Sequence, residues 1–393
     1  MSQIRDLFNQ HDGVLQLWPT WVARPFNRPG KRLRLHPDDY FAMGLDRGAI
    51  VERWFSSITH VETDGAGEFE GMSFVNVDDS TENKVLFKDF IDELGADLIG
   101  QTLIDQFGTW PMYSKFYDYD QPLFHHIHHE EEASARAGVK PKYEHYYFPK
   151  QYNQHLGKMP ISYFGFDPSV SKEEVKERLR NYTKHDTRIT ELSRAWRIEL
   201  DTGWYTPAGV VHAPGSLCTY EPQWNSDAMA IWENVVNGEV FHYDDLSAYV
   251  PEEDKNDIDK IFETANWELN TAPDYRERFF HRPVDEQRGE GFVQKWIVYG
   301  NEYIGAKELY VAPGQTVTIK DPCAYGAVVI EGHGKFGDYD CESPLFIRYG
   351  EPTADEFFVS KDKAAKGVTI TNASKYETLV ILKHFGPDGQ ILP

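Results

Sequence analysis

Histidine and glutamate are concentrated in residues 121–134 of the chain, whose sequence is QPLFHHIHHEEEAS. Imidazole nitrogens and carboxylate oxygens are common ligands of divalent metal ions, although a polar run of this kind is also typical of a solvated loop. In an extended strand alternate side chains share a face, so His126 and His128 point one way and their neighbours point the other. Only one face of such a strand lines the interior of a barrel, so we expect one histidine pair to do so.

A third histidine lies at the end of a turn-like motif. Residues 203–215 read GWYTPAGVVHAPG, and the pattern PxGxxH within them predicts a tight turn that delivers His212 onto a strand. Small jelly-roll barrels commonly bind one ion with an HxH strand and a histidine from a distant strand. The two motifs together predict a metal site that contains His126, His128 and His212.

Two glutamates are candidates for a carboxylate ligand. Glu132 follows His128 by four residues, and Glu144 lies in KYEHYYF, on what reads as the next strand. The spacing alone leaves both open. Three histidines and one carboxylate suit zinc, and also manganese, iron, cobalt or nickel, so we expect one divalent ion per chain with zinc as the first candidate.

The elements that position these residues are predicted to be mostly short strands. Turn residues separate strand patterns at roughly ten-residue spacing, and helical patterns occur at 84–100, at 169–182 after a capping box, and at 252–265. We therefore predict a mainly β fold of two cupin barrels, that is, jelly rolls or double-stranded β-helices, with helical insertions. Residues 1–285 form the metal-binding domain in this interpretation, and residues 286–393 form a second barrel that lacks an equivalent ligand set.

Composition excludes several functional classes. The chain has 63 acidic and 40 basic residues and a formal charge of -23, which repels nucleic acid and anionic membrane surfaces. Its three cysteines form no CxxC pair, and no apolar run has the length of a membrane span or a signal sequence. We expect a cytoplasmic protein with a small-molecule partner; a homodimer is left open.

Several segments, taken in order, resemble the class I mannose-6-phosphate isomerases, which are two-cupin metalloenzymes. WPMYSKFYDYDQPLFHHIHHEEE (110–132) resembles that family's FPLLxKFLDxxxPLSIQVHPDDE, and KYEHYYF resembles its KTExWYxI. GWYTPAGVVHAPGSL and YEPQWNSDA resemble PAGTxHAI and ExQQxSDxT. Order and spacing agree from about residue 50 to 235, which is far more specific than either short motif.

The resemblance implies an intramolecular oxidoreductase that interconverts an aldose and a ketose, acting on a hexose or an anionic hexose derivative. It assigns the metal to His126, His128, Glu144 and His212, and places Glu132 on a loop as a non-ligand. It also implies a proton shuttle at Glu221 and substrate contacts from Lys115, Lys142 and Trp110, the two lysines with a catalytic role as well.

Two positions depart from the family pattern. His126 stands where the family has glutamine, and Ile231 stands where the family has an arginine that meets the substrate. Isoleucine cannot replace a guanidinium, so the cations of residues 23–36, ARPFNRPGKRLRLH, either compensate or belong to a solvated loop. A non-haem iron oxygenase and a sugar-binding protein without turnover are the alternative functions.

Overall fold

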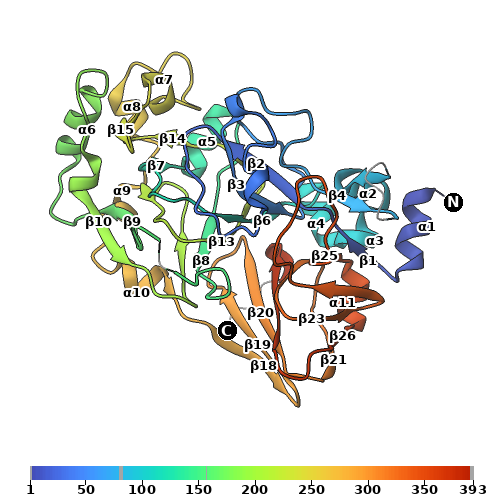
Figure 1. Cartoon of the computed structure of the whole chain (residues 1–393). Helices are drawn as coiled ribbons and strands as arrows, with labels where there is room; N and C mark the ends of the chain where they lie inside the picture. Colours follow the sequence, from blue (N-terminus) through green and yellow to red (C-terminus); the bar gives the residue numbers. More distant parts are fainter. Residues whose placement is uncertain (1, 79–82, 156, 390–393) are drawn as a thin grey trace.

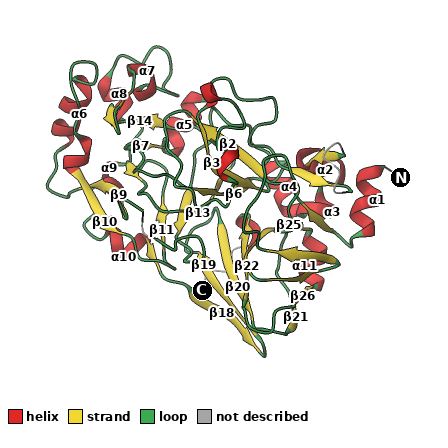
Figure 2. Cartoon of the chain, in the orientation of Figure 1, coloured by secondary structure: helices red, strands yellow, loops and turns green. Residues whose placement is uncertain are grey.

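The computed structural model describes residues 2–78, 83–155 and 157–389 and confirms the mainly β prediction. Figure 2 shows most strands in the middle of the molecule, with helices gathered toward two ends. Every strand pair within the sheets of the described residues is antiparallel. This arrangement agrees with jelly-roll barrels rather than with a βαβ architecture.

Two sheets build the barrel that holds the predicted site. The larger has the order β17-β11-β8-β13-β6-β3-β2 and contains β2 (Thr20–Arg24), β3 (Ala49–Phe55), β6 (Met112–Tyr117), β8 (Glu144–Tyr147), β11 (Gly203–Thr206), β13 (Thr219–Trp224) and β17 (Phe280–His281). The smaller has the order β10-β9-β12-β7-β14 and contains β7 (His126–Ile127), β9 (Ile161–Phe166), β10 (Ser193–Arg197), β12 (His212–Ala213) and β14 (Ala230–Ile231).

The C-terminal third builds a second pair of sheets. Their strands are β1 (Val14–Gln16), β18 (Val284–Gly289), β19 (Phe292–Val298), β20 (Gly305–Val311), β22 (Tyr325–Glu331), β25 (Glu356–Val359) and β27 (Leu379–Phe385) in one sheet, and β21 (Thr316–Ile319), β23 (His333–Phe336), β24 (Tyr339–Glu342) and β26 (Val368–Asn372) in the other. Two hairpins, β4 (Phe74–Asn76) with β5 (Lys84–Leu86) and β15 (Val235–Val236) with β16 (Glu239–Val240), stand apart from these sheets.

Short helices cover the ends of the molecule. They are α1 (Gln3–Gln10), α2 (Phe87–Leu94), α3 (Ala96–Ile99), α4 (Gln101–Phe107), α5 (Glu131–Ala137), α6 (Lys172–Arg180), α7 (Tyr243–Leu246), α8 (Ile258–Phe262), α9 (Trp267–Asn270), α10 (Tyr275–Phe279) and α11 (Lys361–Lys366). The predicted capping residue Ser171 is the N-cap of α6, where its hydroxyl accepts a hydrogen bond from the backbone N–H of Glu174 at 3.2 Å. The third helical pattern forms only the short α8.

The two halves of the chain share a core and a buried ion pair. Strand β1 pairs with β25, so residues near the N-terminus complete the C-terminal sheet (Figure 1). One apolar cluster contains both Phe116 of β6 and Phe358 of β25. Arg53 of β3 donates two hydrogen bonds, both 2.7 Å long, to the buried carboxylate of Asp355. The predicted boundary near residue 286 falls within β18, and the division into two domains stays a prediction.

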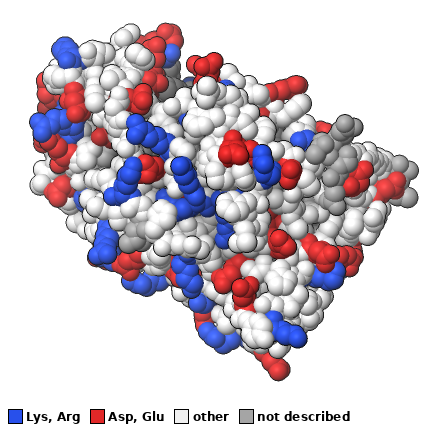
Figure 3. Space-filling model, viewed as in Figure 1, with Lys and Arg blue, Asp and Glu red and all other residues white. Residues whose placement is uncertain are grey.

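No helix in the described ranges combines the length and the apolar character that crossing a membrane requires. Figure 3 shows acidic and basic side chains interspersed over the face viewed.

Candidate metal centre

Four buried side chains meet between the two sheets of the first barrel. His126, His128, Glu144 and His212 each offer a ligand atom, and these atoms lie within 4.8 Å of one another. Nε2 of His212 lies 2.8 Å from Oε1 of Glu144, and Nε2 of His128 lies 3.1 Å from Oε2 of the same carboxylate. The structure thus brings together the four residues that the motif resemblance assigned to the metal.

Local pairing explains why residues so distant in sequence meet. His126 of β7 and His212 of β12 are direct partners in the smaller sheet. The turn before His212 places Gly209 at a φ of +83°, a conformation that favours glycine, and the Gly209 N–H donates to the backbone carbonyl of His128 at 2.6 Å. Glu144 begins β8 on the facing sheet. The PxGxxH turn is therefore hydrogen-bonded to the HxH segment that it complements.

Backbone contacts orient all three imidazoles. Nδ1 of His126 lies 3.0 Å from the carbonyl of Phe124, Nδ1 of His128 lies 2.8 Å from that of Ala228, and Nδ1 of His212 lies 2.8 Å from that of Val210. A carbonyl can only accept, so each Nδ1 carries a proton, which leaves Nε2 as the ligand atom of each ring. This is the form in which imidazole binds a metal.

The electrostatics of the cluster favour a cation at its centre. Burial, and then the neighbouring His212, lower the pKa of His126, while burial followed by Lys142 lowers that of His128 to about 4. Both rings are therefore neutral near pH 7. Nε2 of His212 has no hydrogen-bond partner and lies 2.8 Å from a carboxylate oxygen of Glu144. Imidazole nitrogens and a carboxylate gathered this closely are typical ligands of a divalent ion, so this donor set fits one.

The alternative carboxylate lies elsewhere. Glu132 is exposed on α5, whereas Glu144 is 1% exposed within the cluster. The prediction that Glu132 occupies a loop is wrong, because Glu131–Ala137 form helix α5, which ends at Gly138 in the left-handed conformation. His125 comes directly before β7 and contacts a different carboxylate. Its Nδ1 lies 2.8 Å from Oε2 of Glu233.

The proposed proton shuttle lies next to the cluster. Glu221 of β13 is the direct strand partner of Lys115 of β6, and its Oε1 lies 3.4 Å from Nζ of Lys115 and 3.3 Å from Nζ of Lys142. Lys142 also lies 2.8 Å from Glu144. Burial and the negative charge of Glu144 raise the pKa of Glu221 to about 8, against the opposing effect of the two lysines.

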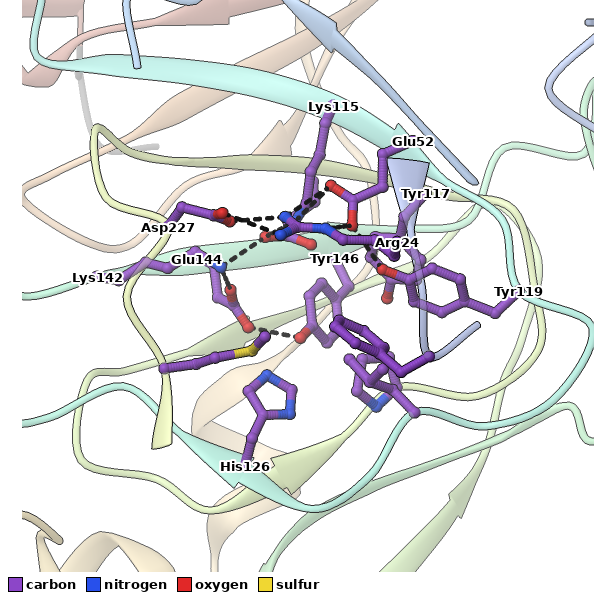
Figure 4. A pocket seen from close by; sticks show the side chains of 15 residues that line it. Arg24, Glu52, Lys115, Tyr117, Tyr119, His126, Lys142, Glu144, Tyr146 and Asp227 are labelled. Carbon is purple, nitrogen blue, oxygen red and sulfur yellow. Dashed lines mark hydrogen bonds and ion pairs between the residues drawn. The ribbon is translucent and has the colours of Figure 1, made fainter. Parts of the chain in front are cut away.

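An arginine that the sequence did not assign to the site completes the cavity. Arg24 of β2 lies 3.0 Å from Glu52 and donates to both oxygens of Asp227, at 2.8 and 3.0 Å. Figure 4 shows this guanidinium between the two carboxylates, above Glu144 and His126. The only sequence signal was the cationic stretch 23–36, whose members diverge: Arg32 pairs with Asp118, and Arg34 donates to Pro344 in the C-terminal half.

These residues enclose a small cavity of about 30 Å³. It is lined by Arg24, Phe26, Glu52, Lys115, Tyr117, Tyr119, Leu123, His126, Lys142, Glu144, Tyr146, Pro214, Glu221, Asp227 and Met229. That volume has room for a few water molecules, so a sugar enters only if side chains move. Trp110, a predicted substrate contact, does not line the cavity: it packs in the core against Phe358, with ring centroids 5.1 Å apart. Ile231 is buried opposite His126.

Comparison with known proteins identifies the fold. No protein-family model and no curated protein matches the chain. Among solved structures, mannose 6-phosphate isomerase from Bacillus subtilis is 17% identical, with 95% of this chain and 99% of that one covered and a TM-score of 0.61. A mutant of phosphomannose isomerase from Salmonella typhimurium is 9% identical, with 95% and 100% covered and a TM-score of 0.62. A zinc-bound mannose 6-phosphate isomerase is 10% identical, with 95% and 99% covered and a TM-score of 0.61. The chain therefore has the fold of the mannose-6-phosphate isomerases that its motifs resemble.

Proposed function

We propose that the protein is a metal-dependent aldose–ketose isomerase that acts on a hexose or a hexose derivative. One observation carries the proposal: a buried carboxylate, Glu221, lies between two lysines immediately beside a four-residue set that fits a divalent ion. The likeness in fold to mannose 6-phosphate isomerases supports the same reaction class.

The reaction moves one proton between C1 and C2 of the open-chain sugar and one hydroxyl proton between O1 and O2, while negative charge develops on the carbonyl oxygen. A divalent ion held by His126, His128, Glu144 and His212 supplies Lewis-acid stabilisation of that charge. We take zinc as the first candidate, because the set of three imidazoles and one carboxylate suits it, and one ion per chain as the stoichiometry.

The chain's own residues hold and move the proton. Glu221 accepts it from one carbon and returns it to the other, since its carboxylate faces the cavity and Oε1 has no hydrogen-bond donor within the described structure. Lys115 and Lys142 lie within 3.4 Å of that oxygen, so they hold the carboxylate in place and compensate its charge. All three side chains are at most 6% exposed, which keeps bulk water away from the site.

A reconstitution assay tests this function. Protein stripped with a chelator is loaded with zinc, manganese, cobalt, nickel or iron(II), and each preparation is given aldohexoses, ketohexoses and their anionic derivatives under anaerobic conditions. We expect isomerisation of at least one pair with one ion per chain and none after stripping. Isomerisation that persists in metal-free protein contradicts the proposal, as does oxygen uptake by the iron form without isomerisation.

A further inference from the structure

We propose that the substrate is an uncharged sugar, and that the cavity discriminates against sugars bearing a phosphate, sulfonate or carboxylate group. This inference rests on the proposed isomerase function and narrows its substrate class. Two features carry it: the pairing of every cation in the cavity, and the apolar character of the cavity's more exposed wall.

The first feature is that each cation of the cavity lining is paired with a carboxylate. The cavity lining contains three cations, and each is already paired with carboxylates of the same lining. Arg24 contacts Glu52 and Asp227 at 3.0 and 2.8 Å. Lys115 lies 3.6 Å from Glu52 and 3.4 Å from Glu221. The third cation, Lys142, lies 2.8 Å from Glu144, which belongs to the proposed metal set, and 3.3 Å from Glu221, which does not.

An anionic substrate has to compete with this network. Outside the proposed metal set the lining holds Glu52, Glu221 and Asp227, one carboxylate for each cation, and all three are at most 6% exposed. A phosphate that displaced one of them from a cation would leave a buried carboxylate uncompensated, which is strongly unfavourable. An uncharged hydroxyl needs no such exchange. An ammonium has three donors and a carboxylate about four acceptor positions, so groups that are already paired can still form a hydrogen bond with the hydroxyl.

The second feature is the composition of the lining nearest to solvent. Among the lining residues only Phe26 and Met229 are more than marginally exposed, and the lining also contains the apolar Leu123 and Pro214. A sugar whose carbonyl end faces Glu221 presents its far end to these side chains. An ionic group there would lose hydration without gaining a donor, whereas the C–H face of a sugar packs favourably on apolar and aromatic side chains.

Two measurements on the metal-loaded protein test the inference. The first compares kcat/KM for each aldohexose with that for its own 6-phosphate, and we expect the uncharged sugar to be preferred at least tenfold. The second compares the Kd of sorbitol with that of sorbitol 6-phosphate by calorimetry, which needs no turnover, and we expect the same order. Equal or stronger preference for the phosphate in either measurement overturns the inference and leaves the isomerase proposal standing. If no sugar is isomerised, the isomerase proposal fails and the polyol titration still decides the charge preference; absence of binding by both polyols overturns the inference.

A charge introduced at the solvent-facing wall supplies a second test. Met229→Lys adds a cation to the partly exposed wall of the cavity, and Met229→Gln is the matched uncharged control. We expect the ratio of kcat/KM for a hexose 6-phosphate to that for the free hexose to rise about tenfold in the lysine variant relative to the glutamine variant, the effect of one charge-assisted hydrogen bond. An unchanged ratio contradicts the placement of the sugar's far end at this wall.

Discussion

Replacing Glu221 by glutamine separates proton transfer from metal binding. The amide has nearly the same shape as the carboxylate but cannot take a proton from carbon. Lys142 keeps its contact with Glu144 at 2.8 Å, and Lys115 keeps Glu52 at 3.6 Å, so neither cation is left unpaired. The substituted side chain is 2% exposed and is not one of the four residues of the metal set, so the fold and the ion should be retained.

The expected loss is that of a general base, about 10²- to 10⁴-fold in rate. At about 1.4 kcal/mol per tenfold change, this corresponds to roughly 2.8 to 5.6 kcal/mol of activation free energy. The assay measures kcat and kcat/KM of Glu221→Gln with metal content determined on the same sample, and both constants should fall together. Glu132→Gln, on the exposed face of α5, is the control. A near wild-type rate for Glu221→Gln at full metal occupancy would refute the assigned role.

Three further variants test the site and the fold. Glu144→Gln should bind metal more than about tenfold more weakly, measured by competition with a chelator, whereas Glu132→Gln should not, because only Glu144 lies within the cluster. Arg53→Ala should lower the free energy of unfolding by about 3–5 kcal/mol in urea titrations, because it leaves Asp355 buried and unpaired. Burial lowers the pKa of His384 to about 3, below the ~6.5 of an unfolded histidine, so the unfolded chain binds the extra proton and stability falls from pH ~6.5 toward about 3. His384→Gln should remove about 1.4 kcal/mol per pH unit from that slope.

Matched substitutions at exposed positions serve as controls for the last two variants. Lys335→Ala breaks the exposed pair with Asp340 and should leave the unfolding midpoint unchanged. His333→Gln, exposed on β23, is the matched control for His384→Gln. An Arg53→Ala variant as stable as wild type would contradict the account of the buried pair, and an unaltered slope in His384→Gln would contradict the assignment of that proton.

Patterns within short segments were sufficient to predict the strand histidines. Alternation along a strand separates His126 and His128 from His125, and the structure places His125 on the other face with Glu233. The PxGxxH turn predicted a histidine on a strand because only a few backbone conformations satisfy Pro and Gly at those positions, and His212 does begin β12. These features depend on local geometry, which a single sequence encodes directly.

Contacts between distant segments were not predictable in the same way. Arg24 and Asp227 are 203 residues apart, and no local pattern distinguishes this buried arginine from its neighbours in the cationic stretch. Spacing left Glu132 and Glu144 equivalent because it does not show that Glu132 lies on helix α5, away from the histidines. Trp110 packs away from the cavity because the face of an irregular segment is set by tertiary packing. Strand β1 pairs with β25, and this register follows from the assembled core.

Solvent exchange during turnover tests the central claim most directly. The metal-loaded enzyme is given its aldose in deuterated buffer, and the sugars are followed by NMR. If Glu221 shuttles the proton, deuterium appears at C2 of the aldose and at C1 of the ketose, and incorporation stops in both Glu221→Gln and chelator-treated protein. Isomerisation without any deuterium incorporation, or with undiminished incorporation in Glu221→Gln, contradicts it.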